Sequence, residues 1–120
     1  MEIMKAEKLV RRLMNKHGLI KWDIELVDSE QFAAACRTDY FHYRTKLSFG
    51  TIILNRACMR AYNEFQITQV ALHEIAHALV DPRLAGEDGG HGLAWEAKAR
   101  ELGYVFGPRL NSSFPIPEGV

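Results

Sequence analysis

Hydrophobic positions at the start of the chain follow two different periods. Residues 1–17 place apolar side chains at helical spacing, with lysine and arginine between them, and Gly18 supplies a helix stop. The apolar positions of this helix are Ile3, Ala6, Leu9, Val10, Leu13 and Met14. The stretch "WDIEL" (22–26) alternates apolar and polar residues instead, which is the period of a strand with one buried face. A helix followed by a strand is therefore predicted.

Two further extended segments follow. Residues 32–44 end in the aromatic cluster "YFHYR", and residues 47–55 contain the β-branched run "GTIILN". Together with the stretch 22–26, they predict three strands, which we expect to form one small antiparallel sheet.

The second half of the chain is mainly helical. Asn63 and Gln66 have the spacing of a capping box, and the helix that they open is expected to end at "DP" (81–82). The stretch "RLAGEDGG" (83–90) predicts a loop, and "GLAWEAKAREL" (92–102) predicts a helix that closes at Gly103. Residues 107–120, with three prolines, are predicted to be an extended tail. The expected fold is α+β, with the helix from Asn63 at its centre.

Composition limits the classes of function. A chain of 120 residues that is 48% hydrophobic and 25% charged has the size of one compact domain, 1–120. Fifteen basic residues balance fifteen acidic ones, so charge does not support nucleic acid as a partner, or an anionic membrane. Two cysteines, Cys36 and Cys58, suit a reducing compartment, and no apolar run approaches the ~20 residues of a membrane span. We therefore expect a cytoplasmic protein without a membrane segment.

The candidate chemistry lies in "HEIAH" (73–77). Two histidines at positions i and i+4 of a helix are about 400° apart around the axis, so His73 and His77 project from one face. Two imidazole nitrogens can then meet one Zn²⁺ ion, which lowers the pKa of a water ligand toward ~7. Glu74 is rotated by about 100° and could accept the proton of that water.

A third ligand separates three interpretations of this motif. Three protein ligands plus water are typical of a catalytic zinc, a structural zinc would take a fourth protein ligand, and a chance motif needs no third ligand. His91 follows a glycine-rich loop and lies between Gly90 and Gly92, which allow the backbone to approach an ion closely. Glu96 is the competing candidate, as in thermolysin-like enzymes. The sequence favours a catalytic metal site with His91 as the third ligand.

These residues resemble the SprT-like zinc metallopeptidases, the group that includes the DNA-protein crosslink protease Spartan. The resemblance rests on "HEIAHAL" (73–79), "HGLAW" (91–95) and "GTIILN" (50–55), and extends over residues 19–104. It implies a zincin-like metalloprotease fold and a zinc-dependent endopeptidase that acts on protein or peptide substrates. By position, the resemblance makes His73, His77 and His91 the metal ligands, and Glu74 the catalytic base.

The chain also differs from many members of that family. It contains no cysteine-rich zinc ribbon after the protease core, so DNA-associated protein substrates are expected from the resemblance alone. The alternative function is a catalytically silent zinc-binding adaptor for a partner protein or nucleic acid. Glu74 favours the enzyme, because an adaptor needs no base beside an open metal position. Tyr40 and Tyr43 could stabilise an oxyanion but are left out of the predicted site.

Overall fold

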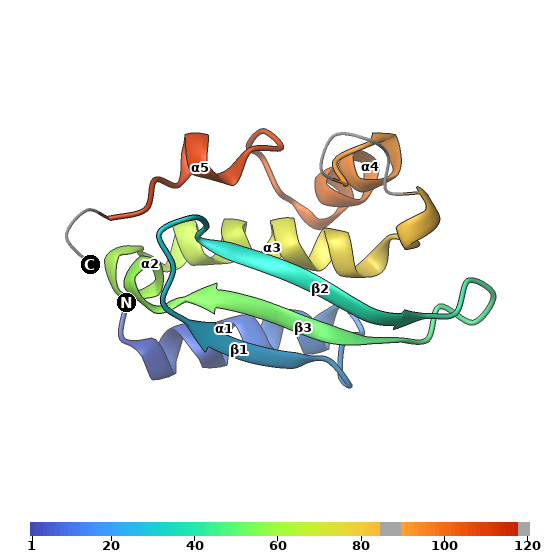
Figure 1. Ribbon diagram of the computed structural model, residues 1–120, viewed down its shortest axis with the longest axis horizontal. Helices are drawn as coiled ribbons and strands as arrows, with labels where there is room; N and C mark the ends of the chain where they lie inside the picture. The colour runs from blue at the N-terminus through green and yellow to red at the C-terminus, as the bar shows by residue number, and fades with distance from the viewer. Residues whose placement is uncertain (85–89, 118–120) are drawn as a thin grey trace.

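The computed structural model describes residues 1–84 and 90–117 and has an α+β fold (Figure 1). Within these residues, a three-stranded mixed sheet lies against five α-helices and one short 3₁₀ helix. The elements are α1 (Ile3–Lys16), β1 (Asp23–Val27), β2 (Ala34–Phe41), β3 (Ser48–Asn55), α2 (Arg56–Ala61), α3 (Glu64–Leu79), η1 (Pro82–Leu84), α4 (Leu93–Leu102) and α5 (Leu110–Ser113). The predicted α+β class is confirmed.

The strand order is β1-β3-β2, and the prediction of an all-antiparallel sheet is wrong. β2 is antiparallel to β3, but β1 is parallel to β3. The connection between β1 and β2 passes the end of β3, where the fully buried Asn55 side chain donates to the carbonyls of Ser29 and Phe32 at 2.6 and 2.9 Å. The chain therefore reverses and returns on the far side of β3, which leaves β1 and β3 pointing the same way.

The sheet packs on the helices through one face. Ile52 and Leu54 of β3 are fully buried there. Trp22 crosses the same face above Gly50, where a Cβ would overlap the indole ring and the Arg37 carbonyl. Only glycine fits this crossing.

Helix α3 is the central helix of the fold. It begins at the predicted capping box, in which the Asn63 side chain accepts from the Gln66 amide and the Gln66 side chain accepts from the Asn63 amide, both at 2.9 Å. Most of its residues are buried, because α1, the sheet and α4 all pack against it. Figure 1 shows α3 between the sheet and the C-terminal part of the chain. None of the helices within the described residues has the length and hydrophobicity to cross a bilayer.

The C-terminal part of the chain corrects the prediction of an extended tail. Its described residues form the short helix α5 and bury Leu110 and Phe114, which are 8% and 1% exposed. The Tyr62 hydroxyl donates to the carbonyls of Phe114 and Pro115, both at 2.9 Å. Leu110 and Phe114, one helical turn apart, anchor this segment in the core. The neighbouring prolines favoured the prediction of an extended tail over that of a helix. The short helix α2, directly after β3, was not predicted either.

Candidate metal centre

Helix α3 presents the first two histidines to one cavity. His73 and His77 lie on the same face, as the i, i+4 spacing predicts, with ring centroids 5.1 Å apart. His73 is buried and His77 is half-buried. The ring nitrogens of His73 contact the Glu74 carboxylate and the Pro108 carbonyl, each at 3.0 Å. An ion that takes one of these nitrogens would replace the corresponding contact.

The loop before α4 brings His91 to the same place. Gly90 has φ +84°, a backbone conformation that favours glycine, and it directs the chain toward the α3 histidines. Nε2 of His91 lies 3.0 Å from Nε2 of His77, and the ligand nitrogens of the three histidines lie within 4.8 Å of one another. A tetrahedral ion with bonds of about 2.0–2.1 Å separates its ligands by roughly 3.4 Å. Three imidazoles at this spacing could bind a metal ion, and nitrogen donors suit zinc.

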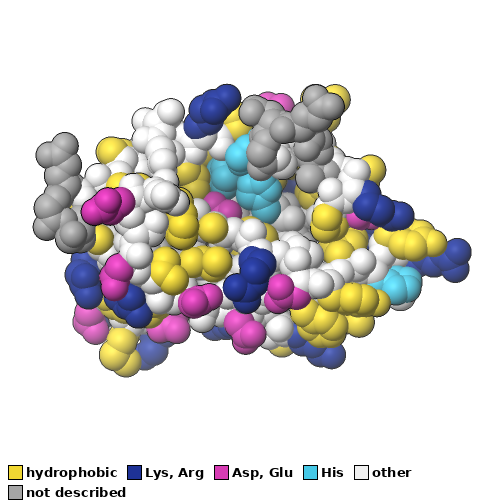
Figure 2. Space-filling view, viewed as in Figure 1, with side chains coloured by type: hydrophobic (Ala, Val, Ile, Leu, Met, Phe, Trp, Pro, Cys, Tyr) yellow, Lys and Arg dark blue, Asp and Glu magenta, His cyan; other side chains and the backbone are white. Residues whose placement is uncertain are grey.

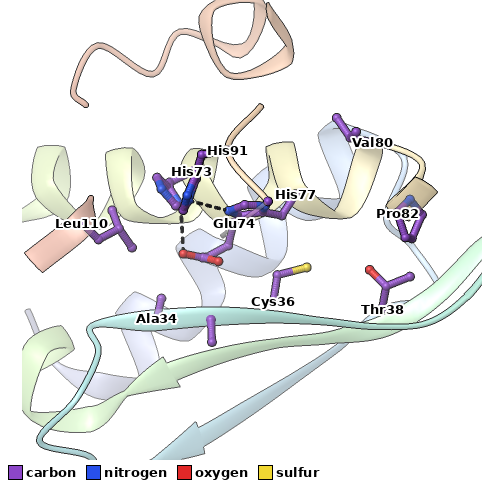
Figure 3. Close-up of a pocket in the computed structure, with 12 residues that line it drawn as sticks. Ala34, Cys36, Thr38, His73, Glu74, His77, Val80, Pro82, His91 and Leu110 are labelled. Carbon is purple, nitrogen blue, oxygen red and sulfur yellow. Dashed lines mark hydrogen bonds and ion pairs between the residues drawn. The ribbon is translucent and has the colours of Figure 1, made fainter. Parts of the chain in front are cut away.

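The Glu74 carboxylate lies beside the histidines, although Glu74 is rotated by about 100° from His73 around the helix axis. Its side chain is 4% exposed, and its Oε2 lies 3.0 Å from Nδ1 of His73. Figure 3 shows the carboxylate between the histidines and strand β2. The carboxylate therefore borders the cavity in front of the histidines.

Trp95 of α4 supports the cluster from behind. Its indole N–H donates to the His73 carbonyl at 3.2 Å, and its ring centroid lies 4.7 Å from His91 and 4.8 Å from His73. The side chain is 1% exposed and belongs to the hydrophobic core. It fixes α4, and with α4 the position of His91, against α3.

The cavity in front of the histidines has a volume of about 430 Å³. Figure 2 shows the histidine surface in a hollow between the sheet and the C-terminal part of the chain. Figure 3 shows β2 along one side of the cavity, with Leu110 near one end and Pro82 near the other. Its lining residues are Ala34, Ala35, Cys36, Thr38, His73, Glu74, His77, Val80, Pro82, Gly90, His91 and Leu110.

Comparison with known proteins identifies the family. A model of the SprT-like family matches residues 7–116, which is nearly the whole chain. The chain belongs to the SprT-like family. The comparisons with curated proteins and with solved structures found no match. The match extends beyond residues 19–104 and includes most of α1 together with α5, so the C-terminal residues are part of the SprT-like unit.

Burial sets the protonation of two groups in the SprT-like cavity. It lowers the pKa of His77 to about 4, although the Glu74 charge opposes this shift, so the imidazole is neutral at pH 7. The neutral ring is the form that binds a metal ion. Burial, followed by the charge of Glu74, raises the pKa of Cys36 to about 12. The Cys36 thiol therefore stays protonated beside the histidines.

The other residues considered in the sequence analysis lie outside the histidine cluster. Glu96 is exposed on α4, and the histidine cluster does not include it. Tyr40 and Tyr43 are 45% and 46% exposed and do not line the cavity. Of the predicted loop 83–90, residues 85–89 lie outside the described residues.

Sequence reasoning missed several residues of the cavity. Cys36, which the sequence related only to a reducing compartment, is half-buried and faces the cavity from β2, with Thr38. Leu110 and the Pro108 carbonyl reach the site from the segment that was predicted to be a tail. No motif marks these residues, because the folded arrangement of distant segments alone brings them to the histidines.

Proposed function

We propose that this SprT-like protein is a zinc-dependent endopeptidase. The observation that carries the proposal is the meeting of three imidazoles beside a buried carboxylate, in a cavity bordered by an edge strand. Three protein ligands leave a coordination position open, as catalytic zinc sites require. The proposed ligands are His73, His77 and His91, and the proposed general base is Glu74.

Each residue has a separate role in this proposal. Bound zinc would supply Lewis acidity, polarising a peptide carbonyl and acidifying a water ligand. Glu74 accepts a proton from the attacking water and returns it to the leaving amine. Its low exposure keeps bulk water away from the carboxylate, which strengthens the electrostatic contribution of this group. Trp95 holds His91 and His73 in position from behind.

The proposed substrate is an extended segment of a protein or peptide. β2 is an edge strand, so its outer side is not paired within the sheet. Pairing with its backbone would hold a peptide across the cavity with little demand on sequence, because main-chain hydrogen bonds supply much of the affinity. The small side chains of Ala34, Cys36 and Thr38 leave space above the strand.

Replacement of the base tests this function. Glu74→Gln should retain zinc affinity close to that of the parent and lose nearly all peptidase activity, because an amide cannot accept the proton. Zinc content and degradation of an unfolded protein substrate should be measured on both proteins, with the exposed Glu96→Gln as a matched control. Parental turnover by Glu74→Gln would show that the base is another group.

The hairpin between β2 and β3 favours a second candidate function, binding of nucleic acid by a silent adaptor. Exposed aromatic rings lie beside cations there: Lys21 is 6.0 Å from the Phe49 centroid, and Arg44 is 5.5 Å from the Tyr43 centroid. Figure 2 shows lysine, arginine and hydrophobic surface at this end of the molecule. Aromatic rings beside cations are typical of surfaces that stack single-stranded bases.

We expect any such binding to be weak, because the formal net charge is zero. Fluorescence anisotropy with a single-stranded oligonucleotide should show a weak affinity that is lost in high salt. Tight binding in high salt, together with zinc binding and no turnover of any protein substrate, would favour the adaptor over the enzyme.

A further inference from the structure

Gln69 is a buried polar residue of α3 that the proposed mechanism does not use. It is 5% exposed and lies about one helical turn before His73. Its Nε2 donates to the Gly103 carbonyl at 3.2 Å, and its Oε1 accepts from the Val105 amide at 2.9 Å. Only this orientation of the carboxamide gives both backbone groups a suitable partner. Gln69 therefore holds the backbone on both sides of Tyr104.

Tyr104 packs directly on one of the proposed zinc ligands. Its ring centroid lies 5.2 Å from that of His73, with an angle of 79° between the ring planes, and the tyrosine is buried. Trp95 contacts the same imidazole with a centroid distance of 4.8 Å. Aromatic rings at such distances are in packing contact. The two rings therefore limit the rotation of the His73 imidazole, and Tyr104 comes from the chain segment that Gln69 holds.

The residues after Tyr104 also lead to His73. The Tyr104 hydroxyl donates to the Gly107 carbonyl, and the Pro108 carbonyl lies 3.0 Å from Nε2 of His73. On the other side, Arg100 of α4 donates to the Tyr104 carbonyl at 2.7 Å. Figure 1 shows this part of the chain, between α4 and α5, beside α3. The bonds of Gln69 tie the segment to the helix that carries His73.

We propose that Gln69 is a positioning residue of the metal centre. By holding the backbone on both sides of Tyr104, it keeps the tyrosine ring packed on His73 and the imidazole in the orientation that binds zinc. A ligand that its surroundings already hold in place loses less conformational entropy when the ion binds, so the affinity is higher. This inference rests on the zinc site of the proposed function and adds a residue that sets zinc affinity without contacting the ion.

Gln69→Met tests this role, because methionine has a similar length and lacks both polar atoms of the carboxamide. Zinc affinity, measured by titration against a competing chelator, should fall by about 10-fold, as for groups that orient metal ligands. Gln66→Met is the matched control. It makes the same substitution on the same helix and also removes a hydrogen bond, which the Asn63 amide donates. This control should destabilise the metal-free fold and keep the parental zinc affinity.

A graded variant and a double-mutant cycle sharpen the test. Gln69→Glu keeps an acceptor for the Val105 amide but, when ionised, has no donor for the Gly103 carbonyl, so its zinc affinity should lie between those of the parent and Gln69→Met. In a Tyr104→Leu background, Gln69→Met should lower zinc affinity by no more than about 2-fold, because the ring through which Gln69 acts is already absent.

A second readout needs no metal. The Tyr104 ring shifts the NMR signals of the His73 ring protons through its ring current. In metal-free Gln69→Met these signals should move, because the tyrosine ring is no longer held, and in Gln66→Met they should keep their parental positions.

The outcomes separate this inference from the proposed function. Failure of the parent to bind zinc would overturn both. If the parent binds zinc, three results would overturn the positioning role alone: parental affinity in Gln69→Met, an equal loss in Gln66→Met, or an undiminished effect of Gln69→Met in the Tyr104→Leu background. Unchanged His73 signals in Gln69→Met would also overturn it.

Discussion

The two long walls of the cavity differ in what they contribute. Helix α3 supplies the reactive groups, since His73, His77 and Glu74 all project from two of its adjacent turns. Strand β2 supplies small side chains, Ala34, Cys36 and Thr38, together with an unpaired backbone edge. Helix α3 packs against α1, α4 and the sheet, whereas strand β2 is an edge of the sheet that pairs with β3 and packs on α3.

This difference suggests a division of function between the walls. Metal binding and proton transfer need side chains whose positions are fixed to a fraction of an ångström, and a buried helix provides that rigidity. Substrate binding by backbone pairing needs an accessible edge and free space, which a strand with small side chains provides. Changes on α3 should therefore affect the metal and the chemistry, and changes on β2 should affect substrate binding.

The largest effect is expected from loss of the proposed ligand that the loop before α4 adds to the two histidines of α3. His91→Ala should weaken zinc affinity severely and abolish activity, whereas Glu96→Ala should leave zinc bound. Glu96 is exposed on α4, five residues after His91, and is the matched control. Loss of a residue that only orients a ligand costs about 10–100-fold in metal affinity, so His91→Ala should exceed that range. Titration against a competing chelator measures the zinc affinities of both variants. Parental zinc affinity in His91→Ala would show that His91 is not a ligand.

A smaller effect on activity is expected from a larger side chain on the β2 side of the cavity. Cys36→Leu places a larger side chain in the cavity and should raise KM for peptides while zinc affinity stays at the parental value. The neighbouring Arg37→Leu introduces the same residue on the exposed face of β2, where the Arg37 side chain is 55% exposed, and should leave KM unchanged. Weaker zinc binding in Cys36→Leu would mean that the walls are not functionally separate.

The smallest effect tests the electrostatic link between the walls. Because the pKa of Cys36 is about 12, iodoacetamide should alkylate this thiol very slowly in the metal-free protein at pH 8. Burial is the main cause of the raised Cys36 pKa, and the Glu74 charge is the second cause. Glu74→Gln should therefore lower the pKa of Cys36 and speed its alkylation. Cys58, whose pKa is also raised by burial but without Glu74, is an internal control. Peptide mass spectrometry gives the alkylation rates of Cys36 and Cys58. An equal acceleration at Cys58 would indicate that the substitution destabilises the whole fold instead of acting through the charge of Glu74.

The sequence predicted the features that depend on local spacing. The first helix was predicted over residues 1–17 and extends over Ile3–Lys16. This helix, the capping box at Asn63 and the helix end at Gly103 follow from patterns within a few residues. The grouping of His73 and His77 follows from the helical repeat. The position of His91 after a glycine-rich loop and the family resemblance both pointed to this residue, which the structure brings to the same cluster.

The features that the sequence did not predict depend on contacts between distant segments. The parallel pairing of β1 follows from a connection that Asn55 holds from the far end of β3. The position of α5 depends on Tyr62, whose hydroxyl reaches the Phe114 carbonyl. Cys36 becomes part of the cavity because β2 occupies the sheet edge beside α3, and no local pattern encodes that edge.

Crystallography of the zinc-loaded protein, with anomalous data at the zinc absorption edge, is the decisive test of the proposed metal centre. We expect one zinc ion about 2.0–2.1 Å from a ring nitrogen of each of His73, His77 and His91, with a coordination position open toward Glu74. Zinc bound elsewhere, or a fourth protein ligand in the open position, would contradict it.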